Sequence, residues 1–232
     1  MTEFDRYALE YEQMHADNVK PSGYDPAYFD EYKVKEIHAR LQEAGVADSP
    51  LKILNFGCGI GKSEPFLRSY FPNAMIMGID VSVESVKLAR KYNAHLLNVE
   101  FDTFEEGGEI PKQTKYDVIF IANVFHHIPF KFHLEILEQL HEIIAENGSL
   151  FIFEHNPHNP LTVRTINRCP FDVDAVLLYP AYTGKILRQS GFSKVKRRFT
   201  LFFPKFLKFL LPLEQKLKSV PIGAQYYFQA KK

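Results

Sequence analysis

Three glycines alternate in the stretch LKILNFGCGIGKS, at Gly57, Gly59 and Gly61, where an apolar run gives way to a more polar segment. A glycine-rich turn between a strand and a helix lets the backbone approach a ligand closely, as in doubly wound sheets that bind nucleotides. The ending GKS imitates a P-loop, but that motif has four residues between its glycines, and three separate Gly57 from Gly61. The dinucleotide fingerprint G-x-G-x-x-G fits better, although its third glycine would fall on Lys62. The stretch therefore favours a nucleoside ligand held by close backbone contact.

Asp80 ends a predicted strand, AMIMGID, at about the 20-residue distance from the glycines where an acidic side chain can hold ribose hydroxyls. An aspartate at the end of a strand can also be only a turn residue or a helix cap. Because Asp80 and the glycines occur together at the expected spacing, we interpret them as a site for a nucleoside with free ribose hydroxyls.

Two adjacent histidines, His126 and His127, follow the predicted strand YDVIFIAN. Histidine titrates near neutral pH and can accept a proton from a hydroxyl or an amine. Adjacent side chains point in different directions, so we expect one of the two to face the cleft, and we favour His127 over His126 as a catalytic base. The alternative is that both are structural, because alignment of reactants alone can supply much of a rate acceleration.

Short apolar runs alternate with amphipathic stretches from Leu51 onward, which predicts a buried, mostly parallel sheet between helices. The expected strands cover residues 52–56, 74–80, 98–101, 116–123, 149–155, 194–203 and 224–232. The expected helices among them cover residues 83–92, 132–147 and 182–190. The predicted fold class is α/β, with a doubly wound, mostly parallel seven-stranded sheet. Residues 1–48 are expected to form an N-terminal helical cap, with Asp25 as the N-cap residue before Pro26.

The 232-residue length suits a single domain, here divided into the cap (1–48), a cofactor-binding core (50–200), and an insert with the last strand (201–232). Lysine plus arginine number 28 and aspartate plus glutamate number 28, which argues against a nucleic acid partner. Two cysteines, a charged N-terminal stretch MTEFDRYALEYEQ and no run of 18 apolar residues predict a cytoplasmic protein without a signal peptide or membrane span. The nine histidines show no metal-ligand spacing, so no metal site is expected.

Six segments resemble, in order and spacing, the class I S-adenosylmethionine-dependent methyltransferases over residues 50–200. They are ILNFGCGIG, GIDVS, FDTFEE, YDVIFIANVFHHIP, ENGSLFIFEH and LRQSGFSKV. The resemblance implies a Rossmann-like methyltransferase fold with an antiparallel last strand. It also implies S-adenosyl-L-methionine as cofactor and S-adenosyl-L-homocysteine as product.

The resemblance assigns cofactor contacts to the glycine stretch and to the ends of the strands. These residues are Asn55, Phe56, Gly57, Cys58, Gly59, Gly61, Asp80, Val81, Asp102, Asn123 and Val124. The family usually has an acidic residue two positions before the first glycine, where this chain has Asn55. For Asp102, the alternative is a loop carboxylate in water.

These observations predict a methyltransferase that moves a methyl group to an O or N atom of a small-molecule, glycan or lipid-linked acceptor by in-line displacement. A nicotinamide-dependent oxidoreductase is the first alternative, which the missing third glycine disfavours. A non-catalytic partner protein that binds S-adenosylmethionine is the second, which Asn55 leaves open. At the end of the fifth predicted strand, Glu154, His155 and Asn156 are candidates for an acceptor-facing wall, followed by a lid-like segment, NRCPFDVDAV.

The segment 194–218, which comprises the sixth predicted strand and most of the insert that follows it, is basic and apolar. It has eight basic residues against one acidic residue, together with several phenylalanines and leucines. This composition is typical of a helix that lies on a membrane surface, and it predicts peripheral contact with the inner face of a membrane. The alternative is a helix that covers the sheet or forms a homodimer interface.

Overall fold

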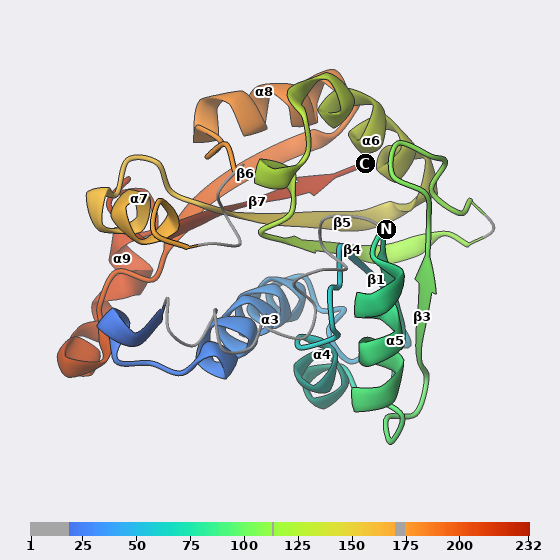
Figure 1. Cartoon of the computed structure of the whole chain (residues 1–232), viewed down its shortest axis with the longest axis horizontal. Helices are drawn as coiled ribbons and strands as arrows, with labels where there is room; N and C mark the ends of the chain where they lie inside the picture. Colours follow the sequence, from blue (N-terminus) through green and yellow to red (C-terminus); the bar gives the residue numbers. More distant parts are fainter. Residues whose placement is uncertain (1–18, 113, 170–174) are drawn as a thin grey trace.

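The computed structural model describes residues 19–112, 114–169 and 175–232. Its strands are β1 (Lys52–Phe56), β2 (Met75–Asp80), β3 (Val99–Thr103), β4 (Tyr116–Ala122), β5 (Ile144–His155), β6 (Ser193–Thr200) and β7 (Gln225–Lys231). They form one seven-stranded sheet in the order β3-β2-β1-β4-β5-β7-β6 (Figure 1). The predicted α/β fold with a mostly parallel seven-stranded sheet is confirmed.

The first five strands pair in parallel, and β7 lies antiparallel between β5 and β6. The direction of the strand order reverses between β1 and β4, which are neighbours in the sheet. At such a reversal the connections leave toward opposite faces, so a crevice opens at the carboxyl ends of the two strands. The topology therefore places the glycine stretch, which follows β1, at the edge where ligands bind.

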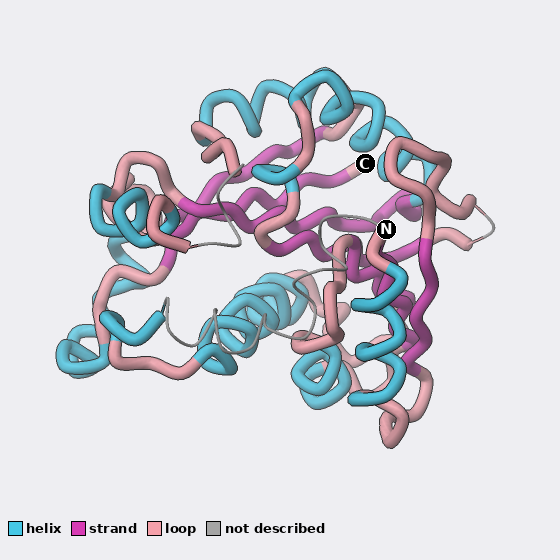
Figure 2. Tube along the Cα trace, in the orientation of Figure 1, coloured by secondary structure: helices cyan, strands magenta, loops and turns pink. Residues whose placement is uncertain are grey.

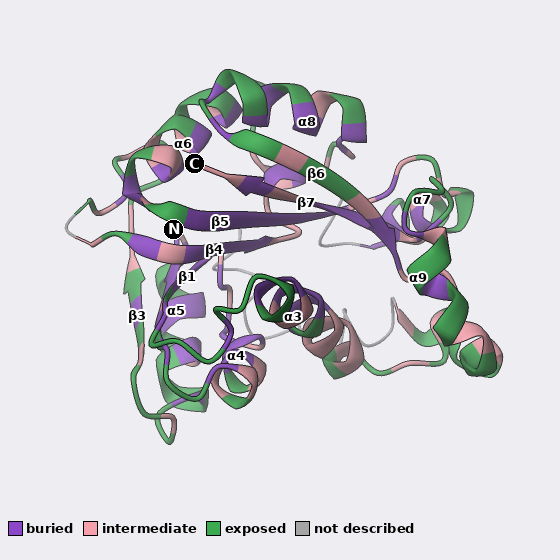
Figure 3. Ribbon diagram, turned by 180° about the vertical axis from the view of Figure 1, so that it is seen from behind, coloured by how far each residue is buried: buried purple, intermediate pink, exposed green. Residues whose placement is uncertain are grey.

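Helices cover both faces of the sheet, whose central strands are buried (Figure 3). On one face, α3 (Pro26–Glu43) and α4 (Glu64–Tyr70) pack on Ile53 and Val118. On the other face, α6 (Phe130–Ile143) and α8 (Pro180–Gln189) pack on Ile119 and Ile121. The remaining helical segments are α5 (Val83–Tyr92), α7 (Pro160–Ile166), α9 (Glu214–Leu217), η1 (Lys20–Ser22), η2 (Phe125–His127) and η4 (Lys205–Leu213). Figure 2 shows how helices and strands alternate along the chain.

The predicted ends of three strands differ from the structure, since β6 ends at Thr200 rather than 203, β3 extends to Thr103 rather than 101, and β5 begins early. We expected a helix up to residue 147 and a strand from 149, but α6 ends at Ile143 and β5 begins at Ile144. Ile144 is fully buried and pairs with Tyr116 of β4. The apolar period of the helix continues into residues that the sheet also buries, so the pattern alone does not mark the transition.

The described part of the N-terminal cap consists of η1 and α3. Asp25 caps α3 as predicted, because its carboxylate accepts a hydrogen bond of 3.0 Å from the backbone N–H of Tyr28. The MTEFDRYALEYEQ stretch and five of the ten residues of the lid-like NRCPFDVDAV segment (170–174) lie outside the described residues. Within the described ranges, no helix combines the length and apolar character needed to cross a membrane.

The insert between β6 and β7 contains η4 and α9 rather than one amphipathic α-helix. Two buried side chains tie it to α3. Glu214 accepts a hydrogen bond of 2.9 Å from the hydroxyl of Tyr32, and Lys218 donates to both carboxylate oxygens of Glu36 at 2.8 and 2.9 Å. Lys218, which we counted with the surface charges of the segment, is therefore an internal anchor that is 5% exposed.

Candidate active site

A cavity of about 210 Å³ lies at the carboxyl ends of β1, β2 and β4. Residues from α3, α6 and the loops after these strands complete its wall. Ten of the predicted site residues line it: Asn55, Phe56, Gly57, Cys58, Gly59, Asp80, Val81, Asn123, Val124 and His127. The fold thus brings the ends of three separate strands to one cavity.

The glycine stretch forms a tight turn at the cavity wall. The N–H groups of Gly57 and Cys58 donate to the carbonyl of Ile79 at 2.8 and 3.0 Å. Gly57 has a φ of +73°, and a Cβ atom there would lie 2.4 Å from Cγ2 of Val124. Gly59 has a φ of +54°, but a Cβ atom there would meet nothing within 4 Å. Gly57 is therefore required for packing, whereas Gly59 leaves open space beside its backbone.

Asp80 is 9% exposed and holds two backbone segments together. One carboxylate oxygen accepts the N–H of Gly59 at 2.8 Å, and the other accepts the N–H of Ser82 at 2.9 Å. Ser82 in turn caps α5, accepting from the N–H of Ser85 at 3.1 Å. Asp80 therefore fixes the turn and also presents its carboxylate to the cavity.

A buried amide–carboxylate pair lies at the end of β1. The side-chain N–H of Asn55 donates to Oε1 of Glu64 at 2.8 Å. Glu64 is fully buried, and its Oε2 has no hydrogen-bond partner in the described part of the chain. Burial raises the pKa of Glu64 to about 7, and the charges of Asp30 and Asp80 act in the same direction, while the hydrogen bond from Asn55 opposes the rise. A carboxylate is thus present next to position 55, supplied by α4.

Acidic and basic side chains line the cavity, and they come from α3 and from the loop before α4. Asp30, Lys33 and Lys62 all line it. The ammonium of Lys33 lies 3.9 Å from the carboxylate of Asp30 and donates to the carbonyl of Phe29 at 3.2 Å. Burial raises the pKa of Asp30 and lowers the pKa of Lys33. This part of the wall can bind a group that carries both a carboxylate and an ammonium.

Apolar side chains line another part of the cavity. They come from α6 and from the loops after β3 and η2, and they are Phe104, Ile128, Phe132 and Ile136. The ring of Phe104 also packs on the ring of Phe56, with centroids 5.4 Å apart. The wall is therefore amphiphilic: charged near α3 and the start of α4, and apolar beside α6.

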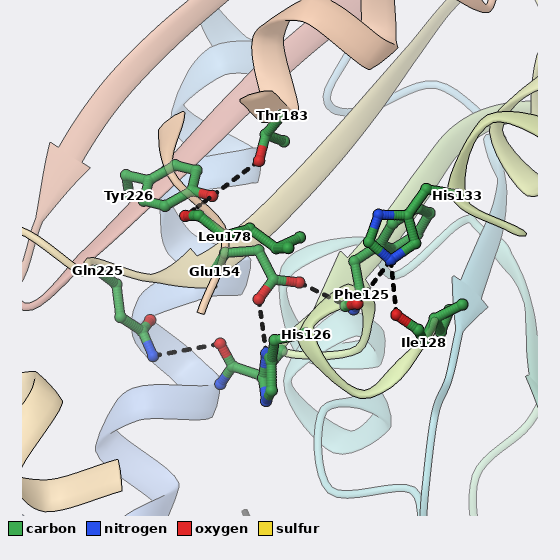
Figure 4. A network of polar contacts seen from close by, with 10 residues as sticks. Phe125, His126, Ile128, His133, Glu154, Leu178, Thr183, Gln225 and Tyr226 are labelled. Atoms are coloured by element: carbon green, nitrogen blue, oxygen red, sulfur yellow. Dashed lines mark hydrogen bonds and ion pairs between the residues drawn. The ribbon is translucent and has the colours of Figure 1, made fainter. Parts of the chain in front are cut away.

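The two histidines have different environments. His127 lines the cavity, whereas His126 is 2% exposed and does not. Nδ1 of His126 lies 2.6 Å from Oε2 of Glu154, and Oε1 of Glu154 accepts the N–H of Phe125 at 2.9 Å (Figure 4). Glu154, which we placed on an acceptor-facing wall, is instead fully buried beneath η2.

His133 supports the same turn from α6. Its Nε2 lies 3.0 Å from the carbonyl oxygen of Phe125 and 2.8 Å from that of Ile128 (Figure 4). Both partners are acceptors, so Nε2 carries the proton. Burial lowers the pKa of His133, which favours its neutral form. Together with Glu154, His133 fixes the backbone that presents His127 to the cavity.

Three predicted residues lie elsewhere. Asp102 is on the outward side of β3, with 62% of its side chain exposed and its carboxylate 3.6 Å from Arg90. Gly61 packs against α5, where a Cβ atom would lie 2.4 Å from Nδ2 of Asn93. His126 is the third, buried against Glu154. The structure does not bring any of the three to the cavity wall.

A family model for a methyltransferase domain matches residues 27–196. The chain belongs to this family. The resemblance to class I S-adenosylmethionine-dependent methyltransferases is thereby confirmed, and the match speaks against the nicotinamide-dependent alternative.

Two relatives and one solved structure are similar to this chain. Trans-aconitate 2-methyltransferase of Sinorhizobium fredii is 33% identical over 116 residues, which are 49% of this chain and 42% of the relative. (S)-coclaurine N-methyltransferase of Papaver somniferum is 25% identical over 158 residues, 63% of this chain and 42% of the relative. The chain therefore matches less than half of the length of either relative. Magnesium protoporphyrin IX methyltransferase from Synechocystis, solved with bound S-adenosylhomocysteine, shares the fold with a TM-score of 0.60 at 18% identity, covering 93% and 94% of the two chains.

Sequence reasoning missed four charged residues that line the cavity, namely Asp30, Lys33, Lys62 and Glu106, as well as the buried Glu64 that pairs with Asn55. Glu64 had a usable signal, because it is the first acidic residue after a glycine stretch that lacks the family's usual acid. Asp30 and Lys33 had none, since α3 precedes the glycine stretch by many residues and reaches the cavity only through tertiary packing.

Proposed function

We propose that this methyltransferase uses S-adenosylmethionine to methylate an O or N atom of a small-molecule, glycan or lipid-linked acceptor by in-line displacement. The observation that carries the proposal is the amphiphilic cavity at the glycine turn, with Asp80 beside the open side of Gly59. When bound, the cofactor supplies an electrophilic methyl group on a sulfonium.

The residues present fit this cofactor. Its amino acid part carries an ammonium and a carboxylate, and the wall near α3 offers Asp30 together with Lys33 and Lys62. Glu64 adds a buried carboxylate with an unsatisfied oxygen in the described structure. The open space beside Gly59 admits a ligand against the backbone, as a bulkier residue would not.

Each part of the wall then has a role. Lys33 and Lys62 attract the carboxylate of the methionine part, and the Asn55–Glu64 pair attracts its ammonium. Asp80 accepts hydrogen bonds from the ribose hydroxyls. Val81 and the apolar side chains of α6 contact the adenine and exclude water from the reacting atoms.

His127 is the residue that we assign to proton transfer. It lines the cavity on η2, a turn whose backbone Glu154 and His133 hold in place. In this role, His127 accepts the proton that the acceptor's hydroxyl or amine loses as its bond to the methyl group forms. His126, paired with Glu154 beneath the turn, positions η2 instead.

The acceptor class is supported by the relatives and by charge. Both relatives are named for small acceptors, trans-aconitate and coclaurine. The chain's equal numbers of acidic and basic residues do not favour a nucleic acid. We also keep the cytoplasmic setting as part of the proposal, on the ground of only two cysteines.

The alternative of a non-catalytic protein that binds S-adenosylmethionine is weakened by the surroundings of Asn55. It relied on the missing acid, and Glu64 supplies a carboxylate 2.8 Å from the amide of Asn55. The test is transfer of a labelled methyl group from S-adenosylmethionine to a panel of hydroxylated, carboxylated and amine-bearing small molecules, sugars and lipid-linked sugars. We expect label in at least one acceptor class. Binding of the cofactor with no transfer to any class would favour the non-catalytic alternative.

A further inference from the structure

A basic and aromatic surface patch lies on η4, away from the cavity. Phe206 and Phe209 are 76% and 71% exposed, and Leu213 is 45% exposed. Lys205 and Lys208 are exposed on the same short helix. Across from them is Lys20 of η1, and these lysines line an open hollow with Phe206. We call Lys20, Lys205, Phe206, Lys208, Phe209 and Leu213 the η4 patch.

Buried polar contacts hold the segment that carries the η4 patch against α3. The carboxylate of Glu214 accepts from the hydroxyl of Tyr32 and from the backbone N–H of Phe202 at 2.9 and 2.8 Å. Lys218 makes its buried ion pair with Glu36 on α3. A Cβ atom at Gly23 would lie 3.1 Å from Cβ of Lys205, so η1 and η4 are in direct contact. The exposed rings are therefore carried by a segment that is attached to α3 and η1 by direct contacts.

The charges around the exposed rings favour a lipid surface over a protein as the partner. No acidic side chain is among the described residues that line the hollow between η1 and η4. Lysine is depleted in protein–protein interfaces, whereas lysine combined with exposed phenylalanine and leucine is typical of surfaces that lie on lipid. Lysine ammonium groups attract anionic headgroups, and the rings can enter the boundary between headgroups and acyl chains.

We propose that the η4 patch docks this protein on the surface of a bilayer that contains anionic lipid. Phe206 and Phe209 insert at the headgroup level, and Lys205 and Lys208 contact lipid phosphates. Figure 1 shows α9, which follows η4, at the same end of the molecule as α7, which follows the carboxyl end of β5, and the carbonyl of Ile222 in the loop before β7 accepts from Asn159 at the start of α7 at 2.7 Å. Leu161 of α7 and Ile222 are also exposed apolar residues, at 72% and 59%. Docking therefore brings the carboxyl edge of the sheet toward the bilayer.

Vesicle sedimentation of the full chain tests the proposal. The probes are vesicles of phosphatidylcholine alone and of phosphatidylcholine with phosphatidylglycerol, each at low and high salt. We expect binding to the anionic vesicles that weakens at high salt, and little binding to the neutral ones. Lys205→Ser with Lys208→Ser should lower the partition coefficient by about fivefold for each lysine removed. Phe206→Ser with Phe209→Ser should lower it by roughly tenfold or more.

The matched control changes exposed residues of the same kinds near the end of α5. Leu97 is 79% exposed and Lys91 is also exposed, so Leu97→Ser with Lys91→Ser should leave vesicle binding unchanged. All variants should keep the wild-type unfolding temperature, since the substituted side chains are exposed. Absence of binding to anionic vesicles at low salt overturns the proposal, as does equal loss in patch and control variants. A wild-type dimer that Phe206→Ser with Phe209→Ser makes monomeric, without vesicle binding, would assign the patch to a second copy of the chain instead.

Discussion

The side-chain amide of Asn55 donates a hydrogen bond of 2.8 Å to the buried carboxylate of Glu64. The class I methyltransferases that the chain resembles usually have the acidic side chain at the position of Asn55. Here the amide stands at the end of β1 and the acid on the first turn of α4. The two residues together keep one carboxylate in this part of the site, with a hydrogen-bond donor directed at it.

Restoring the usual acid at position 55 should therefore harm this protein. Asn55→Asp places two carboxylates in contact in a buried site, where like charges cannot both ionise without cost. At pH 8 we expect a free energy of unfolding lower by about 1–3 kcal/mol and weaker binding of S-adenosylhomocysteine. Thermal unfolding and titration calorimetry measure the two effects.

The double variant Asn55→Asp with Glu64→Gln is the control for that substitution. It exchanges the amide and the carboxyl between the two positions, so stability and binding should return toward the wild-type values. If Asn55→Asp alone is as stable as the wild type and binds at least as tightly, then Glu64 does not stand in for the usual acid.

Glu64 should also make stability depend on pH. Its pKa is about 7 in the folded protein against an ordinary value of 4.5, so between these values the folded state binds more protons than the unfolded state. The free energy of unfolding should therefore fall as pH rises from 4.5 through 7, by up to about 3 kcal/mol. Denaturant unfolding at a series of pH values measures this slope. Glu64→Gln cannot titrate and should lack that part of the slope, while identical slopes in both proteins would contradict the assignment.

Alanine substitutions at the glycines should distinguish an effect on stability from an effect on ligand binding. Gly59→Ala and Gly45→Ala both place alanine at positive φ with no atom within 4 Å, so each should cost about 1–2 kcal/mol of stability. Only Gly59→Ala should also weaken S-adenosylhomocysteine binding, because Gly45 is remote from the cavity. Gly57→Ala should cost about 1–3 kcal/mol more than either, since its Cβ would overlap Val124. Equal binding by the Gly59 and Gly45 variants would remove Gly59 from the cofactor site.

His127→Asn should lower the rate of methyl transfer by roughly 10²–10⁴-fold if His127 acts as the base. Its affinity for S-adenosylhomocysteine should stay close to the wild-type value, because the proposed proton transfer involves the acceptor. The rate is measured with labelled S-adenosylmethionine and the acceptor found in the panel. His95→Asn, at an exposed position beyond α5, is the matched control. A His127→Asn variant with the wild-type rate would mean that alignment alone drives the reaction.

The sequence was sufficient for much of the fold and for the core of the site. The strands at 52–56 and 225–231 lie within a residue or so of their predicted places, because apolar runs between polar turns mark buried strands. Gly57, Gly59 and Asp80 reach the cavity because the end of a strand fixes where its next residues lie. The pairing of Asn55 with Glu64 could not be read in advance, since it depends on how α4 packs beside β1.

Asp102 shows a different limit. It lies next to Phe101 on β3, and successive side chains of a strand point to opposite faces. Phe101 is 7% exposed and faces the core, so Asp102 faces outward to Arg90. A motif match places a residue along a strand, but an uncertainty of one position changes the face on which its side chain lies.

The central claim is that the cavity at the glycine turn binds the nucleoside of S-adenosylmethionine. Titration calorimetry of the full chain with S-adenosylhomocysteine, and separately with NAD, tests it most directly. We expect saturable one-to-one binding of S-adenosylhomocysteine that Gly59→Ala weakens and Gly45→Ala does not, together with no measurable NAD binding. Saturable binding of NAD with no heat from S-adenosylhomocysteine would contradict it.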